Sequence, residues 1–257
     1  MHYSAPAKVN IFLKIVGTRG NYHELMSRFM VVPTLCDTLR FVPKQTKEPF
    51  ELIGTFDCPL TSNTLYKIYN VLLQEGFSDV QRVMEEQALH VTKRIPTGAG
   101  LGGGSSDAAT FLKMLSEKAT LKLSTYEMMA LGSKVGADIA FFASGYASAN
   151  VTGIGEIVEP FEEEALDLEV VTPPLECHTG RVYQTYREYF LQTMDKPLAL
   201  SMLSMKSDVL LERYTMEALN DLFPACLKAY PALKTYAQDG WFFSGSGSSF
   251  FKLSTKG

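Results

Sequence analysis

The pattern of apolar and polar residues near the start of the chain indicates a β-strand. In AKVNIFLKIVG, residues 7–17, the apolar Val9 and Ile11 alternate with the polar Lys8 and Asn10. A period of two is typical of a strand, because successive side chains point to opposite faces. Lys8 and Asn10 therefore share one face and can point into the same cleft. On this pattern alone, a solvated Lys8 on an exposed face is favoured.

The same reading along the chain predicts the other elements. Further strands are predicted at 26–35, 37–43 and 88–96. Helices are predicted at 62–76, 105–119, 124–136, 180–192, 198–203, 207–213 and 216–239. Ser124 and Glu127 have the spacing of a capping box, and residues 137–155 are predicted as a loop with one or two strands. Because strands and helices are grouped rather than strictly alternating, the pattern favours the α+β class over a doubly wound sheet.

Length and composition restrict the classes of partner. A chain of 257 residues is long enough for one large domain or two ordinary ones. The net charge of -4 provides no basic field for nucleic acid. The start of the chain lacks the layout of a signal peptide and of a membrane span, so we expect no membrane partner and a cytoplasmic location. The four cysteines and four histidines lack metal-ligand spacing, and we expect reduced thiols and no metal-binding residues.

The chemically most informative stretch is PTGAGLGGGSSDAA, residues 96–109. Its GAGLGG matches the dinucleotide pattern G-x-G-x-x-G, but that pattern requires an acidic residue about twenty positions further on. The sequence there reads LKLST, which contains no acidic residue. The Walker pattern also fails, because no lysine follows the glycines. Neither a Rossmann oxidoreductase nor a P-loop enzyme is therefore indicated.

Two interpretations of this glycine-rich loop remain open. A flexible turn can present consecutive backbone N–H groups, Ser105 and Ser106 add hydroxyls, and the following helix adds the positive end of its dipole. These are the components of a phosphate site. The alternative is a structural turn in which Ser105 or Ser106 is the helix N-cap. The composition favours the phosphate site.

PTGAGLGGGSSDAA resembles the phosphate loop of the GHMP kinases. Other stretches resemble motifs of one family within that superfamily, the 4-diphosphocytidyl-2-C-methyl-D-erythritol kinases. They occur in the family's order and are APAKVNIFLKIVGTRGNYHEL, GADIAFF, ALNDLFPACLKAYP and SGSGSSFF. The resemblance implies phosphorylation of the 2-hydroxyl of 4-diphosphocytidyl-2-C-methyl-D-erythritol by ATP, in the non-mevalonate route to isoprenoid precursors. It also implies two α+β domains, expected at residues 1–150 and 151–257. The active site is expected in the cleft between them.

The resemblance assigns roles to individual residues. Lys8 and Asp138 match the catalytic pair, with Asp138 accepting the proton of the hydroxyl. The ATP phosphates are expected to contact Pro96, Thr97, Gly98, Ala99, Gly100, Leu101, Gly102, Gly103, Gly104, Ser105 and Ser106. Asn63, Leu65 and Lys93 are the candidates for the adenine pocket, although Asn63 can equally be a helix cap. Mg²⁺ is expected with ATP because it bridges the phosphates, and Ser105 is the candidate protein contact.

The cytidyl substrate is expected to contact Asn10, Tyr22, His23, Thr179 and Tyr183. Tyr22 and Tyr183 can stack on the two faces of the cytosine, whereas Tyr183 can alternatively be a core residue of an amphipathic helix. The loop 244–249, SGSGSS, is a second candidate anion site on the substrate side.

The chain departs from the family's pattern at two positions, Asn21 in GNYH and Gly180 in CHTG.

Two alternative functions remain. The chain can be another GHMP kinase, such as homoserine kinase, or a nucleotide-binding protein without turnover. The sequence carries no signal for an oligomeric state.

Overall fold

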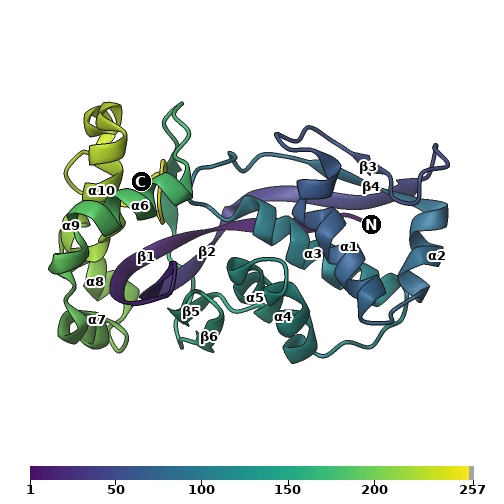
Figure 1. Cartoon of the computed structure of the whole chain (residues 1–257), viewed down its shortest axis with the longest axis horizontal. Coiled ribbons are helices and arrows are strands. Elements are labelled where there is room, and N and C mark those ends of the chain that lie inside the picture. Colours follow the sequence, from purple (N-terminus) through teal and green to yellow (C-terminus); the bar gives the residue numbers. More distant parts are fainter. Residues whose placement is uncertain (255–257) are drawn as a thin grey trace. The chain divides into compact units, whose positions relative to one another are not determined.

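The computed structural model describes residues 1–254, which its contacts group into two compact units. The first unit consists of residues 1–7, 33–95 and 103–145, and the second of residues 8–32, 96–102 and 146 onward. Two long strands, β1 (Tyr3–Arg19) and β2 (Tyr22–Pro43), contribute residues to both units (Figure 1). Both units are therefore discontinuous in sequence. The domain boundary expected at residue 150 differs from this grouping and stays a prediction.

The first unit pairs the end of β2 with β4 (Gln87–Thr92), and β4 with the short β3 (Leu52–Ile53). Its helices are α1 (Thr64–Gln74), α2 (Asp79–Glu86), α3 (Gly103–Lys118), α4 (Thr125–Ser133) and α5 (Ala137–Ser144), preceded by a 3-10 turn at Leu60–Ser62. Helix α3 packs against α1 and α5, which lie beside it in Figure 1. Leu65, Phe111 and Leu112 belong to the hydrophobic core that these helices form with the strands.

The second unit pairs the start of β2 with β5 (Ser148–Gly153), and β5 with β6 (Ile157–Pro160). A separate three-stranded sheet has the order β7 (Leu168–Val171), β9 (Phe250–Leu253) and β8 (Phe242–Phe243). The helices, green to yellow in Figure 1, are α6 (Thr179–Tyr189), α7 (Lys196–Met202), α8 (Ser207–Arg213), α9 (Met216–Leu219) and α10 (Leu222–Ala229). Two 3-10 turns, Leu191–Thr193 and Pro231–Tyr236, complete it. Within residues 1–254, no helix is long and apolar enough to cross a membrane.

The mixed α+β class is confirmed, and so are most predicted elements. The strand at 7–17 lies within β1, and the Ser124–Glu127 capping box is present at the start of α4. The two strands predicted at 26–35 and 37–43 are wrong as separate elements, because β2 is continuous. Its Pro33 lies between the stretch that pairs with β5 and the stretch that pairs with β4, where its missing N–H breaks neither ladder.

Two other predictions are corrected. The loop predicted from residue 137 is the helix α5, which follows Gly136 and ends at Gly145 with φ 73°. Its sequence shows no helical period because Ile139, Ala140 and Phe141 are buried in succession. The helix predicted at 216–239 is interrupted at Asn220, which has extended backbone angles, and again before the Pro231 turn.

Candidate active site

Two glycine-rich loops of the second unit contact each other closely. Ser249 N donates a hydrogen bond to the carbonyl of Ala99 at 3.1 Å, and Ser244 Oγ donates to that of Gly100 at 3.0 Å. A Cβ atom on Gly100 would lie 2.3 Å from the carbonyl oxygen of Ser244, and Gly100 has φ 74°. Only glycine satisfies both constraints, so this position is fixed by packing whether or not the loop binds an anion.

Lys8 lies against the first of these loops. Its Nζ donates to Asn10 Oδ1 at 2.6 Å and to the carbonyl of Gly100 at 3.1 Å, and it stands 4.6 Å from the centre of the Phe29 ring. Its backbone N–H donates to the carbonyl of Leu101 at 2.9 Å. The residue is 4% exposed. The interpretation of Lys8 as a solvated strand residue is therefore wrong, because both faces of β1 are covered here.

The second loop is held by the ALNDL motif. Asn220 Nδ2 donates to the carbonyls of Phe243 at 2.9 Å and Gly245 at 3.0 Å, and its Oδ1 accepts from Leu222 N. The neighbouring Asp221 pairs with the buried Lys14 of β1 and accepts from Ile15 N at 2.8 Å. These contacts tie the loop to the strand that carries Lys8. The ALNDL motif is evident in the sequence, but its contacts with the second loop are not.

The residues that follow the first loop open helix α3. Gly98, Gly100 and Gly102 have φ values of 63°, 74° and 70°, and the helix begins at Gly103. Ser105 and Ser106 lie inside the helix, so the interpretation of either serine as its N-cap is wrong. The Ser106 side chain is buried, and its Oγ has no hydrogen-bond partner among the described residues. The first-turn N–H groups lack intrahelical partners, as in every α-helix.

In the first unit, Lys93 is held between two buried carboxylates. Lys93 Nζ pairs with Asp37 Oδ2 and, at 2.6 Å, with Asp107 Oδ2. Asp37 also accepts from the backbone of Ile95 at 2.8 Å. Burial raises the pKa of Asp107 to about 7, although the charge of Lys93 lowers it. The sequence pattern pointed to Lys93 but to neither carboxylate.

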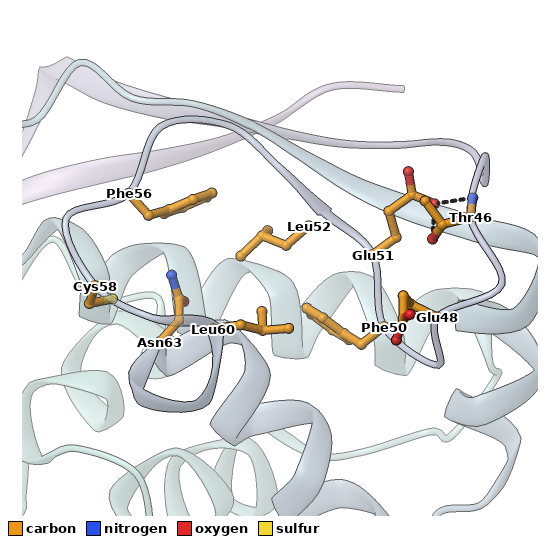
Figure 2. Close-up of a pocket in the computed structure, with 9 residues that line it drawn as sticks. All are labelled: Thr46, Glu48, Phe50, Glu51, Leu52, Phe56, Cys58, Leu60 and Asn63. Atoms are coloured by element: carbon orange, nitrogen blue, oxygen red, sulfur yellow. Dashed lines mark hydrogen bonds between the residues drawn. The ribbon is translucent and has the colours of Figure 1, made fainter.

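A cavity of about 290 Å³ lies in the same unit (Figure 2). Its lining consists of Thr46, Glu48, Phe50, Glu51, Leu52, Phe56, Cys58, Leu60 and Asn63. Asn63 caps helix α1, since its Oδ1 accepts from Leu65 N at 2.9 Å. Asn63 is thus both a helix cap and a wall of the cavity. Leu65, in contrast, is 1% exposed and lies in the core.

Of the predicted cytidine contacts, His23 and Tyr183 lie together in the second unit. The rings of His23 and Tyr183 have centroids 5.2 Å apart, and Tyr22 is 64% exposed at the start of β2. Burial, followed by the charge of Arg187, lowers the pKa of His23, so its imidazole is neutral at pH 7. His23 Nε2 has no hydrogen-bond partner among the described residues.

Helix α6 presents Tyr183 and Thr179 differently from its core residues. Val182 and Tyr186 are buried, whereas Tyr183 is only partly buried. At the start of the helix, Thr179 Oγ1 lies 2.9 Å from Ser246 Oγ of the second glycine loop. Tyr186, rather than Tyr183, is therefore the core tyrosine of this helix.

Asp138 lies in the first turn of α5 in the first unit, where it is partly buried. The loop expected at this position is a helix N-terminus instead, and the positive end of the helix dipole favours a carboxylate there. The motif GADIAFF thus places Asp138 on a helix rather than in a loop.

Comparison with known proteins gives consistent similarities. The family model for the GHMP kinases N terminal domain matches residues 63–146. A protein of Sulfurimonas denitrificans named 4-diphosphocytidyl-2-C-methyl-D-erythritol kinase is 52% identical, with 99% of this chain and 97% of that protein covered. One of the same name from Helicobacter pylori is 42% identical, with 96% and 92% covered.

Solved structures agree with these sequence similarities. A crystal structure of 4-(cytidine 5'-diphospho)-2C-methyl-D-erythritol kinase has a TM-score of 0.75 and 29% identity, and the match covers 99% of this chain and 90% of that one. A crystal structure of mevalonate kinase has a TM-score of 0.61 at 15% identity, with 99% and 91% covered, which shows a shared fold.

Proposed function

The chain belongs to the family of 4-diphosphocytidyl-2-C-methyl-D-erythritol kinases, and we propose that it transfers the γ-phosphate of ATP to the 2-hydroxyl of that compound. The reaction is a step of the non-mevalonate route to isoprenoid precursors, and we place it in the cytoplasm. The observation that carries this proposal is the buried Lys8, whose ammonium lies on the carbonyl of Gly100 in the glycine-rich loop. A cation held at such a loop suits the charge of a transferring phosphoryl group.

The glycine-rich loop and the start of α3 hold the phosphates of ATP in this proposal. The left-handed backbone at Gly98, Gly100 and Gly102 favours N–H groups that turn toward one anion, and the first turn of α3 adds unpaired N–H groups. Lys8 stabilises charge on the transferred group, and Asp138 accepts the proton of the attacking hydroxyl. Leu101 and Ala99 are buried and support the loop rather than line it.

The adenine end of ATP lies in the cavity of the first unit. Its apolar wall of Phe50, Phe56 and Leu60 suits a flat ring, and Asn63 adds an amide at the wall (Figure 2). Lys93, paired with Asp37 and Asp107, belongs to the same unit. Leu65 supports the site from the core instead of contacting the base.

Mg²⁺ enters with the nucleotide. Within residues 1–254, no group of three or more histidine, cysteine or acidic side chains could hold a metal ion. The Ser105 hydroxyl, in the first turn of α3, would supply the protein contact, and the bound ion would neutralise phosphate charge.

The cytidyl end of the substrate lies at Tyr22, His23, Tyr183 and Thr179. The exposed Tyr22 offers a face for stacking, and the unmet hydrogen-bonding capacity of neutral His23 supports a polar contact with the base. Asn10 and the loop 244–249 complete the substrate side.

Release of ADP from Mg-ATP tests the function directly. We expect ADP release with 4-diphosphocytidyl-2-C-methyl-D-erythritol and none with homoserine or mevalonate in parallel reactions. Release with homoserine or mevalonate alone would keep the kinase but reject the cytidyl site. Binding of ATP without ADP release in any reaction would indicate a nucleotide-binding protein instead.

Replacement of Tyr22 by alanine tests the cytidyl site. Base–aromatic stacking contributes about 1–3 kcal/mol, so we expect KM for the cytidyl substrate to rise about 5- to 150-fold, with KM for ATP unchanged. Tyr189→Ala is the matched control, because Tyr189 is 60% exposed in the same unit, close to the 64% of Tyr22. A rise in KM for ATP alone, or equal effects of the two variants, would contradict this placement of the base.

A further inference from the structure

A chain of three hydrogen bonds in the second unit fixes the orientation of the Asn10 amide. Lys8 Nζ donates to Asn10 Oδ1 at 2.6 Å, Asn10 Nδ2 donates to Ser27 Oγ at 3.0 Å, and Ser27 Oγ donates to the carbonyl of Phe12 at 2.5 Å. Ser27 and Asn10 are 0% and 2% exposed, so water does not compete for these groups. Ser27 belongs to β2, and the other three residues belong to β1.

The polarity of each bond follows from the chemistry of its two ends. The ammonium of Lys8 can only donate, and the carbonyl of Phe12 can only accept. Because the single proton of Ser27 goes to Phe12, Ser27 Oγ offers only lone pairs to Asn10. Asn10 must therefore turn its amino group to Ser27 and its oxygen to Lys8. A flipped amide would place donors against a cation and, at the other end, two acceptors together.

We propose that Ser27 is a positioning residue, which acts through Asn10 to hold the ammonium of Lys8 against the glycine-rich loop. The inference rests on the proposed function, because it assigns Lys8 a contact with the transferred phosphate. Loss of the hydroxyl leaves Asn10 Nδ2 buried without an acceptor and frees the amide to move. The amide oxygen of Asn10 then no longer holds the ammonium in one position beside Gly100, and transfer slows without a change in the binding of ATP.

The test is a double-mutant cycle between Ser27→Ala and Asn10→Ala, with kcat, both KM values and the free energy of unfolding measured. We expect Ser27→Ala alone to lower kcat about 3- to 10-fold, the effect of one net hydrogen bond, and to leave KM for ATP unchanged. In the Asn10→Ala background it should have no further effect on kcat. Additive effects, or an unchanged kcat in the single variant, overturn the proposal.

Ser148→Ala is the matched control for loss of a buried serine hydroxyl. Ser148 is 1% exposed on β5, opposite Met30 of β2, and donates to Glu163 Oε1 at 2.7 Å, with no bond to Asn10 or Lys8. It should lower stability but not kcat. Should Ser27→Ala not fold, Ser27→Thr and Ser27→Val differ only by the hydroxyl. A higher kcat in the threonine variant then supports the positioning role of Ser27, and equal kcat values of the two variants overturn it.

The same experiments separate this inference from the proposed function. A Lys8→Met variant with normal kcat would reject the catalytic role of Lys8 itself. Loss of kcat in Lys8→Met together with a normal kcat in Ser27→Ala would reject only the positioning role of Ser27.

Discussion

Asp138→Asn is expected to lower kcat by about 10²–10⁴, the usual contribution of a general base. The substitution keeps the size of the side chain and removes its ability to take a proton. Asp138 lies in the first turn of α5, whose buried Ile139 and Phe141 hold the helix in place. The asparagine should therefore occupy the same position, and KM for both substrates should change little. Steady-state kinetics of the purified variant provide the measurement.

Asp79→Asn separates the chemical effect from the electrostatics of the helix. Asp79 is exposed in the first turn of α2, in the same unit, and makes the same kind of interaction with a helix dipole. Asp79→Asn should lose about 0.3–1 kcal/mol of stability from that interaction, so it reports the contribution of a helix dipole. Only Asp138→Asn should lose activity. A reduction of kcat by no more than about twofold would be well below the contribution of a general base. It would remove Asp138 from the mechanism.

Local patterns predicted the elements whose two faces differ or whose ends are marked. Alternation gave β1, and the Ser124–Glu127 spacing gave the start of α4, which has the full capping box. Helix α5 was not predicted because its residues are apolar in succession. The period of such a run does not distinguish a helix from a strand. The burial of Lys8 was not predicted for a related reason. Alternation of apolar and polar residues does not show whether the polar face of a strand is covered by other elements.

Contacts between distant residues could not be predicted from spacing. Lys93 lies 56 residues from Asp37 and 14 from Asp107, and Ser27 lies 17 residues from Asn10. Only the pairing of strands and the packing of α3 bring these groups together. The family motifs supplied Lys8 and Asp138 as candidates. They also contain Asn10, Gly100 and Asp107, but their spacing does not show that these groups contact Lys8 and Lys93. Such supporting groups depend on the folded backbone, so the structure was needed to find them.

Lys8→Met is expected to lower kcat about 10²–10³-fold, the effect of removing one group that stabilises transition-state charge. Methionine fills similar volume but leaves Asn10 Oδ1 and the carbonyl of Gly100 without this donor. Desolvation of the buried ammonium opposes the stability that its contacts provide, so kcat rather than the free energy of unfolding is the discriminating quantity for this variant. Lys14→Met should show the opposite pattern. Lys14 is buried on the same strand and pairs with buried Asp221.

Removal of Lys14 leaves Asp221 as an unpaired buried charge, which should lower the free energy of unfolding by about 3–5 kcal/mol. Its kcat per folded molecule should fall much less than that of Lys8→Met, because its contacts are with Asp221 and the carbonyl of Ala218 rather than with the glycine-rich loop at Gly100. Urea unfolding and kinetics on the same preparations distinguish the two lysines. If Lys8→Met lost stability to the same extent as Lys14→Met and kept its kcat, Lys8 would be a structural ion on β1. A selective loss of kcat in Lys8→Met would instead link the charge of Lys8 to phosphoryl transfer. Each of the two variants removes one buried ammonium group from the same strand, so the removal of a charge alone would not explain the difference.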